Sequence, residues 1–250
     1  NEDSTVVENR VLTTAEIQNA AATFEGLDMG VPYIAQIFYN EVLRGTLNTK
    51  TSGSSGSLIF NINIPGITAE DISTALAGHA AEGTKKVTVN FASGMEFNME
   101  GTITIPTGIQ DISFVGSENA NGKLSQLNKV YFAIESEVND VNFEYLSMNS
   151  DGGFMFQVGA QKFHDITFEG CEVKQVNSAV RLHSGAEGNS VNFNNCWVSN
   201  TGGWSFLNVG SGCTIPAINV TNSTLTEFNT RIADIRVKTD IKFKNVTLVN

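Results

Sequence analysis

The sequence predicts an all-β protein, a right-handed parallel β-helix built as a three-sheet solenoid, with a small N-terminal cap of mixed structure. Two observations predict this fold. A four-residue pattern, in which Ile or Val and then Phe or Val alternate with polar or small residues, recurs along the chain, and no ten-residue helical stripe separates its copies after Gly101. The six copies begin at Asp111, Asp140, Asp165, Ser190, Ala217 and Asp240.

The spacing of the copies indicates a solenoid. They lie 29, 25, 25, 27 and 23 residues apart, and such a period is typical of a repeat that must stack on its neighbours to bury its apolar face. Alternation of period two with β-branched and aromatic residues indicates strands. Leucine-rich, ankyrin and tetratricopeptide repeats are excluded because they need helices, and a propeller blade needs roughly 40 residues. Three short strands per turn therefore fit.

Each repeat divides in the same way. After the first strand comes a corner at Gly170, Asn195, Asn222 or Asn245. Gly and Asn tolerate a left-handed backbone, so we expect a sharp corner there, with Asn side chains hydrogen-bonded to one another along the axis. A second strand, a variable turn and a third strand follow. The third strands are FMFQV, AVRLH, SFLNV and ADIRV.

This organisation resembles the pectin-lyase-like right-handed parallel β-helix superfamily, and is most similar to uncharacterised β-helix proteins that gut bacteria export. The resemblance covers roughly Ile72 to Asn250. TAEDISTALAGHAAEG, with Thr68 as N-cap, predicts the amphipathic capping helix of the family. The following segment, KKVTVNFASGMEFNMEGTITIPTGIQDISFVGS, resembles its first coils. The superfamily hosts unrelated functions, so the resemblance implies a fold and no particular activity.

Residues 1–67 are predicted to form a helical or mixed cap, and residues 68–250 the β-helix. TTAEIQNAAATF and VPYIAQIFYNEVL have helical spacing, GTLNTKTSGSSGS is predicted to be a flexible linker, and LIFNINI is strand-like. The last repeat stops after its second strand. An uncovered solenoid edge invites pairing, so we expect either further chain downstream or self-association through the C-terminal edge.

Composition limits the partners. The net charge is −11, with 15 basic residues scattered among 26 acidic ones, which argues against nucleic acid. No run of 18 apolar residues predicts a membrane span. The polar start NEDSTVVENR resembles a mature or trimmed N-terminus. We therefore expect a bacterial protein of the cell surface, periplasm or medium, either free or lipid-anchored before trimming.

No metal or cofactor site is predicted. Cys171, Cys196 and Cys213 lack the spacing of a metal motif or disulfide framework and are interpreted as buried thiols. His79 and His164 have no ligand partner at metal spacing. The Asp that opens four of the six copies is expected to bond nearby backbone amides in a turn.

The outward side chains of the third strands are the candidate site, because the resemblance implies substrate along that sheet. Alignment on Phe156, Leu182, Leu207 and Ile235 places Met155, Arg181, Phe206 and Asp234 in one outward row, and Gln157, His183, Asn208 and Arg236 in the other. Hydrogen-bonding groups beside an aromatic platform suit a sugar, and a solvated polar face is the alternative. The predicted carbohydrate-binding residues are Arg181, His183, Trp204, Phe206, Asn208, Asp234 and Arg236.

Catalysis is left open by the sequence. Glycoside hydrolysis needs two carboxylates, and this face carries Asp234, with Asp151 and Glu227 in adjacent turns. Lyases of the superfamily use an acidic calcium cluster and a basic residue; the resemblance makes Arg181 or Arg236 a candidate base, but the Asp-rich strand is missing. We therefore expect a secreted or cell-surface protein that binds a poly- or oligosaccharide, with or without processing it. The alternative is a non-catalytic structural or adhesin-type solenoid.

Overall fold

The structure is a computed structural model, and it describes residues 6, 8–19, 22, 24, 32–50, 57–229 and 231–249. The chain divides into two compact units, Asn1–Ser54 and Ser55–Asn250. The larger unit is a parallel β-helix of about eight turns, which confirms the predicted fold class. Each unit is described by itself below.

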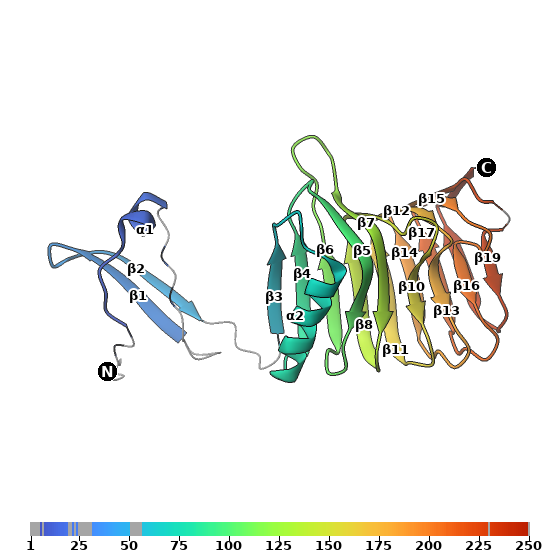
Figure 1. The fold of residues 1–250 in the computed structure, drawn as a ribbon, viewed down its shortest axis with the longest axis horizontal. Coiled ribbons are helices and arrows are strands. Elements are labelled where there is room, and N and C mark those ends of the chain that lie inside the picture. Colours follow the sequence, from blue (N-terminus) through green and yellow to red (C-terminus); the bar gives the residue numbers. More distant parts are fainter. Residues whose placement is uncertain are drawn as a thin grey trace. The chain divides into compact units, whose positions relative to one another are not determined.

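The first strand of every coil belongs to one eight-stranded parallel sheet, called wall 1 here (Figure 1). The repeated motifs pair in the register that the sequence predicts, from Asp111 opposite Asp140 to Ala217 opposite Asp240. Two earlier strands precede the six predicted copies. The strands of wall 1 are β3 (Ser57–Ile62), β4 (Lys86–Phe91), β6 (Asp111–Val115), β8 (Val138–Glu144), β11 (Phe163–Glu169), β14 (Ser190–Asn194), β17 (Ala217–Thr221) and β20 (Asp240–Lys244).

The second and third strands of the coils form walls 2 and 3, which are joined into one eleven-stranded sheet. The join is made by β5 (Glu96–Ile105) and β7 (Ser125–Ile134), because each runs through both walls. Wall 2 continues with β9 (Leu146–Asn149), β12 (Glu172–Val176), β15 (Trp197–Thr201), β18 (Thr224–Thr226) and β21 (Thr247–Val249). Wall 3 continues with β10 (Phe154–Val158), β13 (Ser178–Leu182), β16 (Leu207–Val209) and β19 (Ala233–Ile235).

Corner 1, between walls 1 and 2, has the predicted left-handed backbone. Gly170, Asn195, Asn222 and Asn245 all have φ between 51° and 61°. The amide ladder is confirmed for Asn245, whose Nδ2 donates to Asn222 Oδ1 at 3.0 Å. Asn195 donates instead to Glu169 Oε1 at 2.7 Å. At Gly170 the absence of a side chain is required, because a Cβ there would lie 2.7 Å from the Tyr145 ring.

Corner 2, between walls 2 and 3, is also left-handed, and the sequence did not predict it. Its residues are mostly charged or amide side chains, which adopt positive φ less readily than Gly. The strain is held by the parallel pairing on both sides of the corner. The charged or amide residues of corner 2 with positive φ are Glu100, Lys129, Asp151, Gln175, Asn200 and Glu227, and Gly152 and Ser205 in the same connections also have positive φ.

The core is a column of aromatic rings contributed by wall 1. Phe143 and Phe168 stack with centroids 4.6 Å apart, and Phe168 and Phe193 with centroids 4.4 Å apart. Rings from wall 3 meet this column edge-on, as Phe206 does against Phe193 at 4.6 Å. Phe168 is fully buried, so the column fills the centre of successive coils.

The predicted capping helix is confirmed as α2 (Ala69–Ala81). Thr68 and Asp71 form a capping box, each side chain bonding to the other's backbone N–H. Ile72 and Leu76 are fully buried. Ser73 Oγ accepts the backbone N–H of Thr104 at 2.9 Å, and this bond fastens α2 to β5.

The smaller unit contains α1 (Thr14–Asn19) and an antiparallel hairpin of β1 (Pro32–Tyr39) and β2 (Val42–Lys50). The helical spacing predicted for VPYIAQIFYNEVL is therefore wrong. Asn40 and Glu41 have φ of 49° and 64°, which is the backbone of a two-residue hairpin turn. The β-branched and aromatic residues beside it favour strands. Of the predicted linker, residues 51–56 lie outside the described residues.

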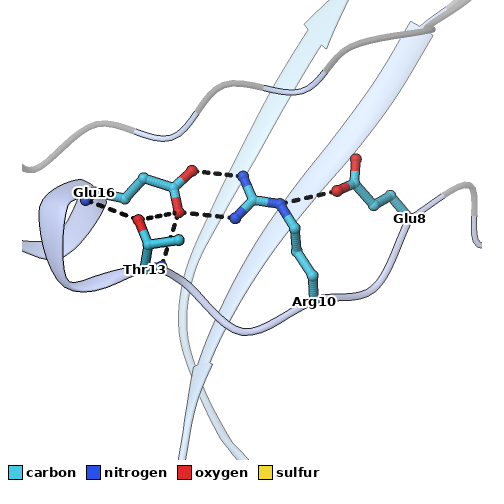
Figure 2. Close-up of polar contacts among 4 residues, drawn as sticks. All are labelled: Glu8, Arg10, Thr13 and Glu16. Atoms are coloured by element: carbon cyan, nitrogen blue, oxygen red, sulfur yellow. Dashed lines mark hydrogen bonds and ion pairs between the residues drawn. The ribbon is translucent and has the colours of Figure 1, made fainter.

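An ion-pair cluster holds the start of α1 (Figure 2). Arg10 binds both carboxylate oxygens of Glu16, at 2.8 and 2.6 Å, and its Nε lies 2.8 Å from Glu8. Glu16 also accepts the Thr13 backbone N–H at 2.8 Å, which completes a capping box. The hydrogen bond from Arg10 and those from Thr13 lower the pKa of Glu16 to about 2, so this carboxylate stays ionised at ordinary pH.

The outer edge of the last described coil exposes side chains that are core residues in other coils. Ile241 and Phe243 pair with Ile218 and Val220, which are fully buried. Ile241 is nevertheless 41% exposed and Phe243 47% exposed. The predicted self-association through this edge stays a prediction.

Replacing Phe168 by Ala is expected to lower the free energy of unfolding by about 3–5 kcal/mol, because it opens a cavity within the aromatic column. Thr167→Ala, which alters the neighbouring half-buried position, is the control and should cost far less. Denaturant titration followed by circular dichroism measures both. Equal losses for the two variants would mean that the column contributes no special stability.

Candidate functional site

The outward row of wall 3 is formed by Gln157, Arg181, Asn208 and Asp234, which are paired in consecutive strands. The alignment made from the sequence placed Leu182 and Ile235 level with Phe156, and it is wrong by two residues at both. In the structure Leu182 and Ile235 each pair with Val209. Two adjacent residues are buried near the start of three of these strands, so strict alternation fails there. These buried pairs are Met155 with Phe156, Ala179 with Val180, and Phe206 with Leu207.

Two residues predicted to point outward are therefore in the core. Met155 and Phe206 are both fully buried. Phe206 packs on Phe193, so it offers no surface to a ligand. An aromatic platform on this face must therefore be formed by rings other than Phe206.

Arg181 lies against two aromatic rings. Its guanidinium carbon is 4.3 Å from the centroid of Phe154 and 5.1 Å from that of Trp204. The two rings meet edge-to-face at 5.9 Å. Trp204 is 42% exposed, and the cation–π contacts hold the guanidinium in place beside it. Phe154 was missed from the sequence, where it looked like an ordinary residue of a buried strand.

Gln157 and His183 extend this group. His183 Nε2 and Gln157 Oε1 are 3.3 Å apart, a contact that the ring makes as donor when Nε2 carries the proton. Burial and the nearby Arg181 charge lower the pKa of His183. At neutral pH the imidazole is therefore uncharged. Gln157 was placed in an outward row by the sequence but was not among the predicted binding residues.

Asp234 belongs to a second group. It pairs with Arg236 at 3.1 Å and with Arg231 at 3.3 Å. The hydrogen bond from Arg236 lowers the pKa of Asp234, so the carboxylate is ionised. Asn208 lies between this group and Arg181 and is only 6% exposed. The single patch predicted from the sequence is thus divided into an Arg181 group and an Asp234 group.

Asp151 and Glu227, two of the carboxylates named from the sequence, do not form a hydrolytic pair with each other. Asp234 is the one acidic residue in the described outward row of four. Asp151 and Glu227 lie on corner 2, three coils apart, which is about 14 Å at the spacing of neighbouring strands. Flanking carboxylates in glycosidases are about 5–9.5 Å apart. Asp151 and Glu227 are therefore too far apart to flank one glycosidic bond.

Within the described part of the chain, the Asp residues that open the repeat do not bond to backbone amides as predicted. Asp111 and Asp165 bond instead to side chains of neighbouring strands, Lys86 at 2.9 Å and Ser190 at 2.5 Å. His164, predicted to have no ligand partner, has Nδ1 3.4 Å from both Asp140 and Asp165. The parallel register brings these residues together, because Asp140 and Asp165 stand directly opposite one another.

The three thiols are buried and free, as predicted. Cys171 and Cys196 each donate to a backbone carbonyl oxygen of the preceding coil, at 3.3 and 3.4 Å. Burial raises the pKa of Cys196 to about 12 and that of Cys213 above its usual value. A buried thiol with a raised pKa forms little thiolate, so these three side chains are poor nucleophiles in the folded protein.

Comparison of the chain with protein-family models, curated proteins and solved structures found no match. The parallel β-helix is therefore established by the strand pairing itself. Within the described part of the chain, no helix is both long enough and apolar enough to cross a membrane.

Thiol accessibility gives a direct check of the interior. In the folded protein, 5,5′-dithiobis(2-nitrobenzoate) is expected to react with Cys171, Cys196 and Cys213 far more slowly than in denaturant, because all three are buried. Release of nitrothiobenzoate is followed by absorbance. Rapid reaction of any thiol under native conditions would contradict its buried placement.

Proposed function

We propose that this protein binds an oligosaccharide on the outer face of wall 3, at the group formed by Phe154, Gln157, Arg181, His183 and Trp204. The observation that carries the proposal is the placement of the Arg181 guanidinium, 4.3 Å from one aromatic ring and 5.1 Å from another. Sugar recognition uses an apolar ring face together with fixed polar groups. This group supplies both on neighbouring coils, from strands β10 and β13 and from the segments that follow β13 and precede β16.

Each side chain has a role in the proposed contact. Trp204, 42% exposed, offers ring surface to the C–H face of a pyranose. Arg181 donates hydrogen bonds to hydroxyl or ring oxygens, and its position between two rings reduces the entropy lost on binding. Gln157 and the neutral His183 supply both donors and acceptors. The Asp234 group, two strands away, adds a carboxylate that accepts hydrogen bonds from hydroxyls.

The proposal is one of binding, because the row of this face holds one carboxylate and its pKa is lowered. A general acid needs a raised pKa near the working pH. A protein that recognises extracellular polysaccharide acts outside the cytoplasm, so the proposal includes export to the cell surface, periplasm or medium. Cell fractionation with an antibody to the chain measures that part separately.

Calorimetric titration with glycans that bind in a glycan array tests the proposal. Arg181→Ala is expected to weaken binding about tenfold or more, since a hydrogen bond to a charged group is worth about 1.5–3 kcal/mol. Trp204→Ala should also weaken it. Trp197→Ala is the matched control, because Trp197 is a similarly exposed tryptophan on wall 2, 50% exposed.

Two results would overturn the proposal. One is the absence of binding to all plant and host glycans by the wild-type protein. The other is binding that Trp197→Ala weakens and Trp204→Ala leaves unchanged, which would move the site to wall 2.

The second candidate function is a structural one, assembly through the outer edge of the last described coil. Its support is the exposure of Ile241, Phe243, Leu248 and Val249, of which the first three pair with fully buried residues of the preceding coil. Burial of such side chains between two copies would be favourable by roughly 25 cal/mol per Å².

Light scattering across a concentration series tests this candidate. The wild-type chain is expected to associate as concentration rises, and Phe243→Ser to associate less because it removes a large apolar group from the edge. Ile59→Ser, which changes an exposed side chain of β3, is the control. A monomer at every concentration would remove assembly as a function of this edge.

A further inference from the structure

Three carboxylates stand in a column on the outer face of wall 1. Asp111, Asp140 and Asp165 are direct neighbours in consecutive parallel strands. Like charges directly opposite one another destabilise a sheet, and the chain as a whole has a net charge of −11. Some group must offset this repulsion.

Lysine offsets it at one end of the column only. Lys86 Nζ lies 2.9 Å from Asp111. Asp165 Oδ1 accepts a hydrogen bond from Ser190 Oγ. Ser190 Oγ in turn accepts a hydrogen bond from Asn192 Nδ2 at 2.7 Å. Asp140 has weaker support, from the more distant Lys86 charge and from His164 Nδ1, which lies 3.4 Å from its Oδ1. Its Oδ1 has almost no exposed surface and accepts no hydrogen bond within the described part of the chain, although the side chain as a whole is 44% exposed.

His164 completes a set of three ligand atoms. One ligand atom from each of Asp140, His164 and Asp165 lies within 4.8 Å of the other two. The Nδ1 atom of His164 is 3.4 Å from Asp140 Oδ1 and 3.4 Å from Asp165 Oδ2. In a tetrahedral zinc site with bonds of about 2.1 Å, neighbouring ligand atoms are about 3.4 Å apart. The distances from His164 Nδ1 to the two Asp oxygens therefore already match two edges of such a tetrahedron.

We propose that Asp140, His164 and Asp165 bind a divalent transition metal ion of the zinc class on wall 1. The Asp140 oxygen that accepts no hydrogen bond, the like charges and the imidazole nitrogen each favour such an ion. One nitrogen and two carboxylates suit Zn²⁺ or Mn²⁺, whereas Ca²⁺ prefers six to eight oxygen ligands. Rotation of the Asp140 and Asp165 side chains closes the third edge.

The surroundings fit a site that is open to solvent. His164 is 60% exposed and Asp165 33% exposed at the side chain, so water has access to a fourth coordination position. Ser190 orients Asp165 by donating to the oxygen that does not face His164, the role that second-layer hydrogen bonds have in metal sites. Asp111 is excluded from the ligand set by its bond to Lys86.

This metal site is independent of the proposed sugar site. It lies on wall 1, on strands β8 and β11, whereas Arg181 and Trp204 belong to the wall 3 face. The ion would stabilise two neighbouring coils by joining them. Failure of either proposal leaves the other intact.

Calorimetric titration of the whole chain with zinc chloride tests the inference, together with imidazole NMR spectra. The wild-type protein is expected to bind one Zn²⁺ at this cluster with a shift of the His164 ring signals, and to give no comparable heat with Ca²⁺. His164→Gln and Asp140→Asn should each weaken binding at least about tenfold, because loss of a supporting group alone costs about 10- to 100-fold. Ser190→Ala should weaken it less.

His79→Gln is the matched control, since His79 Nδ1 lies 3.2 Å from Glu82 but has no second carboxylate in its described contacts. It is expected to leave zinc affinity unchanged. The inference is overturned if zinc leaves the His164 signals in place, which would make the cluster an ion pair only. It is also overturned if His79→Gln and His164→Gln weaken binding equally. Circular dichroism of each variant confirms that its fold is retained.

Discussion

The stacking of each coil directly on the one before is the constraint on which the rest of this molecule depends. A single coil has three short strands and cannot bury its apolar side chains alone. In-register pairing solves this by placing Phe143, Phe168 and Phe193 in one column, with ring centroids 4.4–4.6 Å apart. That spacing is close to the separation of neighbouring strands, so one geometry satisfies the backbone hydrogen bonds and the aromatic contacts together.

The same constraint determines what the surface can do. A residue type that recurs at one position of the repeat forms a row on the surface if that position points outward, and a column in the core if it points inward. Asp111, Asp140 and Asp165 recur for this reason and create a concentration of charge that a random surface would avoid. The Arg181 group arises in the opposite way, because Phe154 and Trp204 occupy places where the repeats differ from one another. The proposed metal site is thus a consequence of register, and the proposed sugar site a consequence of differences between the repeats.

The parts that the sequence predicted are those governed by local periodicity. Wall 1 was predicted in exact register because its motif alternates strictly and its corner uses Gly or Asn. Wall 3 was not, because Phe206 and Leu207 are both buried as the chain leaves corner 2, and alternation cannot place them. Corner 2 itself uses residues such as Lys129 and Gln175, whose positive φ is imposed by tertiary pairing. The apolar residues of the hairpin in the smaller unit have helical spacing by coincidence. Its turn residues, Asn40 and Glu41, were the sequence signal that could have indicated a hairpin.

Strands β5 and β7 each run from wall 2 through corner 2 into wall 3, whereas later coils use strands as short as three residues. The two long strands pair on both sides of a register shift between Asn98 and Gly101, and α2 is fastened to β5. Longer strands join the coils around β5 and β7 through more hydrogen bonds than three-residue strands can form. Because each coil couples only to its neighbours, local opening is expected to begin in coils with the shorter strands. Both proposed sites lie on coils that follow the two long strands.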